Sequence, residues 1–191
     1  MALSVRIQGS GLVRFSDAVE ALGEVRARKA YSRAVNDAGR DTKTPTQRAL
    51  AQQTGLKVKV TRKALRITRA SPATLEYKLT GTGGDIALKY FGARETRKGT
   101  SAAPFNKRKV FSGAFIKGGQ FPNRVDIGRG GHVFERASMS RFPINKVKSG
   151  VVIPNEMVKD ATARTFERVG QAKLQEKVLR HVKLVAKGVL S

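Results

Sequence analysis

The stretch LRITRASPATLEYKLT, residues 65–80, decides the fold class of this chain. Apolar residues occupy every second position on both sides of its Ser-Pro pair. They are Leu65, Ile67, Leu75, Tyr77 and Leu79. Because side chains point to alternate faces of a strand, this spacing predicts a β-hairpin with one buried face and a turn at the Ser-Pro pair.

The residues before the hairpin have a helical spacing instead. A short strand is expected at Ser4–Gln8, and after a glycine-containing break Ser16 or Asp17 can cap a helix. The apolar residues that follow recur every three or four positions, which is typical of a helix with one buried side. They are Val19, Leu22, Val25, Tyr31, Ala34, Val35 and Ala38.

The sequence TPTQ at 44–47 leaves two possibilities for the end of this helix. Thr44 can cap a second helix, with Pro45 at its first position and Gln47 as the partner in a capping box. Alternatively, the first helix continues through Asp41 and kinks at the proline. In both cases Gly55 is expected to end the helical region.

After the hairpin, short strand patterns alternate with glycine-rich turns. Ile86, Leu88 and Tyr90 alternate, Val110–Ile116 returns to a strand pattern, and GRGGHVFERA at 128–137 contains another short strand. Between them, the residues RETRKGTSAAPFNKR at 94–108 have no apolar period. We expect a long basic loop over 92–109, which is either functional or without fixed structure until the protein assembles.

The last segment predicts a closing amphipathic helix over residues 155–187, which begins after Pro154. Its apolar stripe includes Met157, Phe166, Val169, Val178 and Val182, with lysines and arginines largely on other sides. The predicted fold class is therefore α+β. It consists of an N-terminal strand and long helix, an antiparallel sheet of about five strands with the basic loop, and the closing helix. A length of 191 residues favours a single domain over 1–191.

Composition points to a polyanionic partner or to an assembly that neutralises charge. The chain has 38 basic and 14 acidic side chains, for a net charge of +24. There is no cysteine, which excludes disulfides, thiolate zinc sites and cysteine nucleophiles. We find no pattern of a signal peptide and no run of roughly 18 apolar residues, so we expect a soluble protein that is made in the cytoplasm and has no membrane partner.

Nothing in the sequence indicates catalysis, a metal or a cofactor. His132 has Glu135 three residues later, but a metal site needs three or four ligands. His181 lies in a lysine-rich helical segment, with Glu176 as the nearest acid at helical spacing. The glycine-rich stretches at 81–85 and 128–132 lack the residues of a phosphate loop or a dinucleotide site. We therefore expect no enzymatic activity, no catalytic residues and no cofactor.

The basic loop carries the candidate residues for contact with DNA phosphates. Phosphate neutralisation needs only accessible lysines and arginines, and the long loop is free to project. No zinc finger, RNA-recognition motif or aromatic platform is present, so base-specific reading is not expected. The candidates are Arg94, Arg97, Lys98, Lys107, Arg108 and Lys109.

Several motifs, taken in order, resemble those of the minor tail protein Z family of lambda-like tailed bacteriophages and prophages. They are RKAYSRAVNDAG at 28–39, TRKALRITRASPATLEYKLTG at 61–81, SGAFI at 112–116, HVFER at 132–136, and RFPINKV at 141–147 followed by IP at 153–154. The resemblance covers nearly the whole chain, except that it is loose at 94–109.

The resemblance implies a tail completion protein, which is a structural virion protein. Such a protein acts in the neck, at the head-proximal end of the tail, and makes the tail competent for head–tail joining. It is assembled in the host cytoplasm. The implied partners are further copies in a homo-oligomeric ring around the DNA channel, the tail terminator or tail tube proteins, the head–tail connector proteins and phage DNA. The alternative is a free-standing basic nucleic-acid-binding protein of the ribosomal or nucleoid kind.

Two groups of residues are candidates for subunit interfaces. Val169, Val178 and Val182 should be buried, either against the sheet or against a neighbouring subunit. Arg136 and Arg141 are expected to pair with a neighbour or a phosphate. Pro143 and Pro154 are interpreted as scaffold that brackets the last part of the sheet, since proline has a fixed φ and cannot donate to a ladder.

Overall fold

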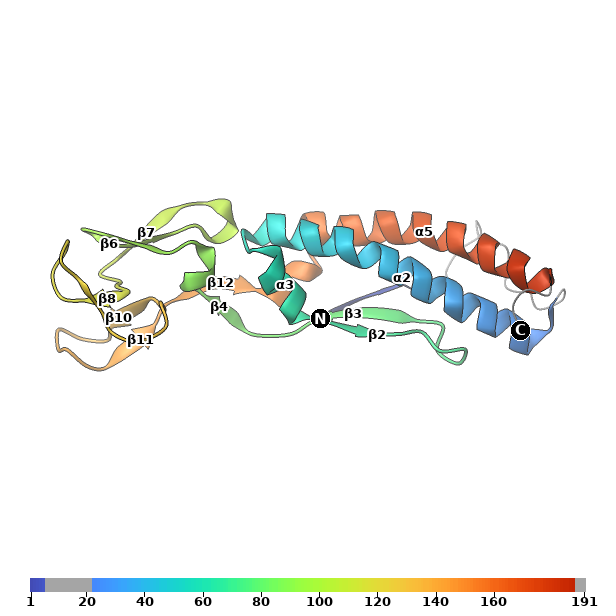
Figure 1. The fold of residues 1–191 in the computed structure, drawn as a ribbon, viewed down its shortest axis with the longest axis horizontal. Coiled ribbons are helices and arrows are strands. Elements are labelled where there is room, and N and C mark those ends of the chain that lie inside the picture. The colour runs from blue at the N-terminus through green and yellow to red at the C-terminus, as the bar shows by residue number, and fades with distance from the viewer. Residues whose placement is uncertain (6–21, 188–191) are drawn as a thin grey trace.

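The computed structural model of the protein describes residues 1–5 and 22–187. The molecule is elongated, with two long helices and a small sheet in one half and a group of short strands at the other end (Figure 1). The predicted mixed α+β fold is confirmed. We call residues 93–147 the β-rich tip. The other described residues form the helical half.

Two antiparallel helices form the helical half, α2 (Glu24–Thr54) and α5 (Asp160–Ala186) (Figure 1). They pack closely because the buried side of α2 is rich in small residues, among them Ala27, Ala34 and Ala38. The buried side of α5 repeats every four residues through Phe166, Gly170, Leu174 and Val178. Short side chains on both helices let the backbones approach and bury a continuous apolar seam.

Helix α2 runs through Pro45 without a break, so of the two possibilities at TPTQ the first helix continues and no second helix starts at Thr44. Proline removes one backbone donor within the helix. The hydroxyls of Thr42 and Thr46 lie on the buried side next to it and donate to carbonyls one turn earlier. Gly55 ends the helix as expected, in the left-handed conformation with φ 77°. The proposed cap at Ser16 or Asp17 lies outside the described residues.

The closing helix over 155–187 is not continuous, which corrects the prediction. A short helix, α4 (Ile153–Met157), precedes α5, and the chain turns at Val158–Asp160. The Gln53 side chain of α2 enters this break. Its Nε2 donates to the Glu156 carbonyl at 3.0 Å, and its Oε1 accepts from the Thr162 N–H at 3.0 Å and from the Thr162 hydroxyl at 2.8 Å. The Gln53 side chain thus forms hydrogen bonds with both the end of α4 and the start of α5.

The predicted hairpin is present as β2 (Leu65–Thr68) and β3 (Tyr77–Gly81). The N-terminal strand β1 (Ala2–Val5) pairs with the other edge of β3, giving the order β1-β3-β2. Tyr77 packs on Gly39 of α2, where a Cβ would overlap the Tyr77 ring. The sheet therefore covers α2 on a side that α5 leaves open.

Shorter elements connect the helical half to the tip. Helix α3 (Val58–Ala64) leads into β2, and β4 (Asp85–Ala87) continues into the 3-10 helix η1 (Leu88–Phe91). The strand β12 (Lys148–Val152) pairs antiparallel with β4 and leads back to α4. Leu88, Phe91, Val151 and Ile153 extend the core toward the tip.

The tip contains three small antiparallel sheets. The first is β5 (Arg94–Thr96), β6 (Gly99–Ala102) and β7 (Lys109–Ser112), with the 3-10 helix η2 (Pro104–Asn106) between β6 and β7. The others pair β8 (Lys117–Gly118) with β9 (Val125–Asp126), and β10 (Phe134–Arg136) with β11 (Ile144–Lys146). No sheet of the described chain exceeds three strands, so the expected sheet of about five strands is divided.

Candidate assembly and nucleic-acid surfaces

The basic segment 92–109 is folded rather than a long loop, which corrects the expectation from its sequence. Strands β5 and β6, the 3-10 helix η2 and the first residue of β7 contain most of it, and β6 is buried throughout although its sequence is GTSA. Thr100 donates its hydroxyl to the Ala114 carbonyl at 3.0 Å. Small polar residues can be buried here because the ladder and these side-chain bonds satisfy their polar groups.

The six basic candidates of this segment are all exposed, but they do not form one cluster. Arg97 and Lys98 lie in the turn between β5 and β6. Arg94 pairs with Ser101, and Ala102 with Lys109, near the other end of the sheet, where Lys107 and Arg108 also lie. The candidates therefore divide between the two ends of one small sheet.

Two of these residues already have contacts within the chain. Arg108 donates from Nη1 to the Ser101 hydroxyl at 3.1 Å and to the Gly92 carbonyl at 3.4 Å. The Lys109 ammonium lies 4.8 Å from the centre of the Phe111 ring, within cation–π range. These contacts hold both side chains near the sheet, so Arg94, Arg97, Lys98 and Lys107 are the more accessible cations of the segment.

Glu95 holds the tip together, a role that its sequence context did not indicate. Its carboxylate accepts the N–H groups of Ile116 and Lys117 at 2.6 and 2.8 Å, and Arg124 Nη1 at 2.8 Å. Burial alone would raise the pKa of Glu95, but the hydrogen bonds from Lys117, Ile116 and Arg124 outweigh it and lower the pKa below its ordinary value. Three segments of the tip thus meet at one carboxylate.

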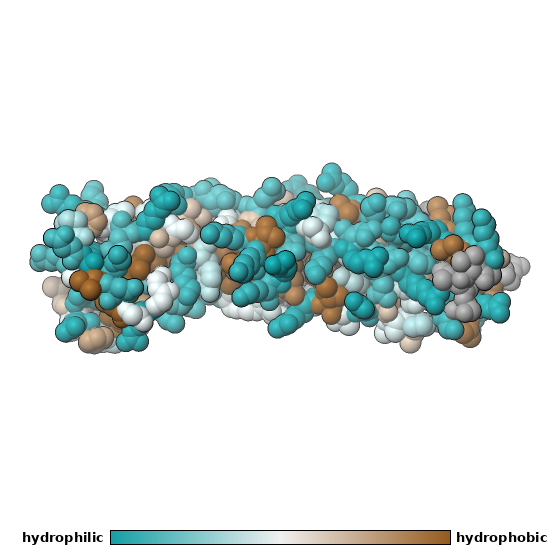
Figure 2. Space-filling view, viewed as in Figure 1, coloured by the Kyte–Doolittle hydropathy of each residue, from teal (hydrophilic) through white to brown (hydrophobic). Residues whose placement is uncertain are grey.

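Exposed apolar side chains and unpaired strand edges gather at the tip. In the part of the chain that the structure describes, β5 and β7 are the edges of their sheet, and the β8–β9 and β10–β11 pairs have only two strands each. Figure 2 shows hydrophobic residues at this end of a largely hydrophilic face. The exposed large apolar residues of the tip include Val110, Phe121, Val125, Met139 and Phe142. Such edges and side chains are features of a contact surface.

The interface candidates fall in two places. Val178 is completely buried within this chain, so its burial is explained without a neighbouring subunit, and Val169 and Val182 are half-buried on α5. Arg136 and Arg141 are exposed at the β10–β11 hairpin. The Arg136 guanidinium lies 5.9 Å from the Phe115 ring centre, and that of Arg141 lies 5.7 Å from the Phe142 ring centre. Only the arginines are at the tip.

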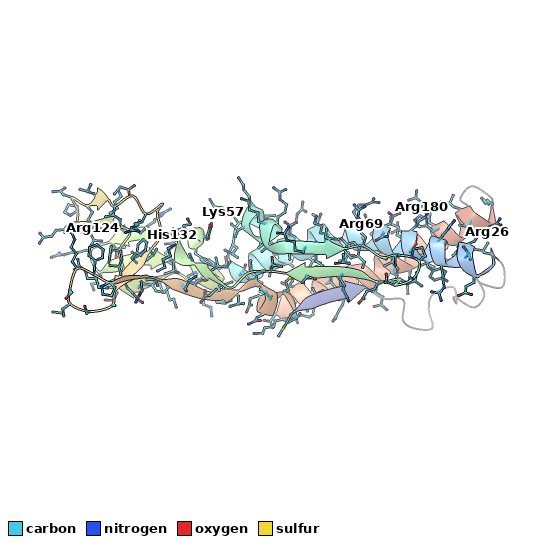
Figure 3. The ribbon with its side chains drawn as sticks, turned by 90° about the horizontal axis from the view of Figure 1, so that it is seen from below. Arg26, Lys57, Arg69, Arg124, His132 and Arg180 are labelled. Carbon is cyan, nitrogen blue, oxygen red and sulfur yellow. The ribbon has the colours of Figure 1, made fainter. Side chains whose placement is uncertain are left out.

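The two histidines lie far apart, as Figure 3 indicates for His132 at the tip. Burial, followed by the nearby charges of Lys89, Lys146 and Lys148, lowers the pKa of His132 below its ordinary value. His181 is in α5 and contacts Asp37. Within residues 1–5 and 22–187, no group of three or more histidine or acidic side chains is placed to hold a metal ion.

Comparison with known proteins gives no relative: no family model, no curated protein and no solved structure matches the chain. None of the helices in the described residues combines the length and the apolar character needed to cross a membrane.

Proposed function

We propose that this chain is a structural subunit of a tailed-phage neck, a tail completion protein that forms a ring around the DNA channel. The motif resemblance supplies the specific assignment. Self-assembly is supported by the tip, where unpaired strand edges lie beside exposed apolar residues such as Val125 and Phe142. Unpaired strand edges pair readily with other chains, so their presence beside exposed apolar side chains favours contact with further copies.

The net charge of +24 is consistent with this role, because a ring of such subunits would surround a polyanion. The proposed partners are further copies, phage DNA through its phosphates, tail terminator or tail tube proteins, and head–tail connector proteins. The proposed location is the neck of the virion tail, after assembly in the host cytoplasm. The role requires neither catalysis nor a cofactor.

The ring is tested by placing charge on the tip. In Val125→Asp/Phe142→Asp, two carboxylates replace exposed apolar groups, so stacking of tip against tip should fail. Val25→Asp/Leu179→Asp is the matched control, because both residues are exposed but lie in the helical half. Sedimentation and electron microscopy should show rings for the unchanged protein and the control, and monomers for the tip variant.

Two results would overturn this proposal. One is an unchanged protein that stays monomeric at all concentrations, and the other is equal assembly by both double variants. The assignment to the neck is tested in a tailed phage that encodes the chain. There, the tip variant should yield filled heads and free tails that do not join.

The alternative function is that of a free-standing nucleic-acid-binding protein. The spread of positive charge over both halves of the molecule favours it, since a ring subunit needs cations only toward the channel. A protein that binds duplex DNA as a monomer and is absent from purified virions would fit this alternative. Neighbouring genes for a tail tube, a tail terminator and a tape measure would argue against it.

A further inference from the structure

A basic hollow lies in the helical half, between α2, the β2–β3 hairpin and α5. Its volume is about 490 Å³, and residues from all three elements line it. Four cationic side chains surround it, three from α2 and one from the residue after β2. They are Arg33, Arg40, Lys43 and Arg69. None of them belongs to the basic segment of the tip.

The spacing of the α2 cations explains why they share one side of the helix. Arg26, Lys29, Arg33, Arg40 and Lys43 follow one another at three, four, seven and three residues, which keeps them on one face. At a rise of 1.5 Å per residue, this row is about 25 Å long. It begins at the end of α2 where Figure 3 labels Arg26 and ends at Lys43, which lines the hollow.

The hairpin brings Arg69 to this row through a specific anchor. Asn36, between Arg33 and Arg40, donates to the Ala70 carbonyl at 2.9 Å and accepts the Ala70 N–H at 2.8 Å. This pair of hydrogen bonds holds the residue that follows Arg69 against α2. Figure 3 shows Arg69 over the helical half, with Arg180 of α5 farther along it.

The lining of the hollow also includes two groups that are almost completely buried. Tyr77 is 3% exposed. Burial raises the pKa of its phenol, and the positive charges of Arg69 and Arg40, which lower the pKa, have smaller effects. His181 is 8% exposed, and its Nε2 lies 2.9 Å from Asp37 Oδ2. The other ring nitrogen of His181, Nδ1, is buried and has no hydrogen-bond partner.

The charges of the hollow are unbalanced. Among the lining residues that the structure describes, Asp37 is the one carboxylate, and it already accepts from Arg40 Nη2 at 2.8 Å and contacts His181. Basic side chains therefore outnumber acidic ones in this described lining. Like charges in a concave surface raise the local potential and favour an anionic ligand.

We propose that this hollow and the row of cations on α2 bind the phosphate backbone of a nucleic acid. Guanidinium groups match phosphate oxygens in geometry and charge, and three of the four cations at the hollow are arginines. A row of about 25 Å is far longer than a single phosphate needs, which favours a polymer. The aromatic ring in the lining, Tyr77, is buried and offers no exposed stacking face, so the contact reads the backbone and not the bases.

This inference rests on the proposed function for the identity of the nucleic acid, which would be the DNA in the channel. It moves the main phosphate contact away from Arg94, Arg97, Lys98 and Lys107 at the tip to the helical half. The tip is then available for contacts between subunits.

The test compares two double variants of the full-length protein. Arg40→Gln/Arg69→Gln removes two charges at the hollow, and Arg48→Gln/Arg168→Gln removes two exposed charges elsewhere on α2 and α5. Binding to a mixed-sequence DNA duplex is measured over a range of salt concentrations. Each lost phosphate contact lowers the slope of log affinity against log salt by roughly 1, so the hollow variant should lose about 2 and the control much less.

A third variant, Arg40→Lys/Arg69→Lys, keeps both charges and should retain most of the slope. Equal slopes for the hollow variant and the control would overturn the proposal, as would a loss that lysine does not restore. Calorimetry with inorganic phosphate distinguishes a site for free phosphate from a site for the phosphates of a nucleic acid. Tight binding of free phosphate without binding of the duplex would also overturn it.

The result is separable from that of the ring experiment. A protein that binds DNA through the hollow but never forms rings would contradict the neck role alone. A protein that forms rings while the hollow variant binds DNA as well as the control does would contradict this inference alone.

Discussion

Replacing Gln53 by alanine should destabilise the helical half. The side chain makes four hydrogen bonds across the break between α4 and α5. Nε2 donates to the carbonyl and to Oε2 of Glu156 at 3.0 and 3.1 Å. Oε1 accepts the N–H and the hydroxyl of Thr162 at 3.0 and 2.8 Å.

The expected magnitude follows from these partners. Loss of a cap at the start of a helix costs about 1 kcal/mol. Thr162 is completely buried, so its hydroxyl and N–H lose their acceptor without access to water, at a cost of about 1–3 kcal/mol. We expect Gln53→Ala to lower the free energy of unfolding by about 3 kcal/mol, which corresponds to a fall in Tm of about 6–12 °C for a chain of this size.

The measurement is urea unfolding followed by far-ultraviolet circular dichroism, with Gln52→Ala as the control. Gln52 is the neighbouring residue on α2 and its side chain is exposed, so this change should stay within about 0.5 kcal/mol of the unchanged protein. Gln53→Glu keeps an acceptor for Thr162 but places a second carboxylate beside Glu156, and should be no more stable than alanine at neutral pH. Equal stability of Gln53→Ala and Gln52→Ala would refute the reasoning.

Two further changes test the packing of each half. Gly39→Ala adds a Cβ that overlaps the Tyr77 ring and should cost about 1–3 kcal/mol in thermal unfolding. Gly84→Ala, with open space around it, is the control and should cost much less. Similar values for the two variants would count against the Gly39–Tyr77 contact. Because the folded pKa of Glu95 is lowered, its stabilising contribution is complete above its unfolded pKa and is lost as the pH falls through the folded value. Glu95→Gln should therefore be less stable than the unchanged protein at neutral pH and lose less stability below about pH 4 in urea titrations, and parallel pH profiles would contradict this role.

The parts of the fold that depend on local sequence were predictable. The alternation at residues 65–80 predicted the β2–β3 hairpin, and Gly55 ends α2 because a left-handed residue is needed there. The break before α5 was not predictable, because its partner is Gln53, more than a hundred positions earlier. The apolar stripe in the sequence continues across that break, so the stripe by itself predicts one uninterrupted helix.

The tip and the basic hollow were missed for different physical reasons. Strand β6 is made of Gly99, Thr100, Ser101 and Ala102, which have no apolar period, and it is buried because its neighbours satisfy its polar groups. The cations of the hollow come from α2 and from the hairpin, which only the fold brings together. The spacing of seven residues from Arg26 to Arg33 to Arg40 is the one signal in the sequence that indicates this face of α2.

The antiparallel pairing of α2 with α5 has a consequence for synthesis on the ribosome. The two helices are separated by more than a hundred residues that include the whole tip, and their contacts include Asp41–Lys177 and Asp37–His181. During translation, α2 cannot pack on α5 until α5 emerges, although strands β1 to β3 can already cover another side of α2. The nascent chain therefore exposes apolar surface for most of its synthesis, and the helical half closes only after the tip has been made. A chain interrupted before α5 would be a substrate for chaperones and proteases rather than a shorter folded protein.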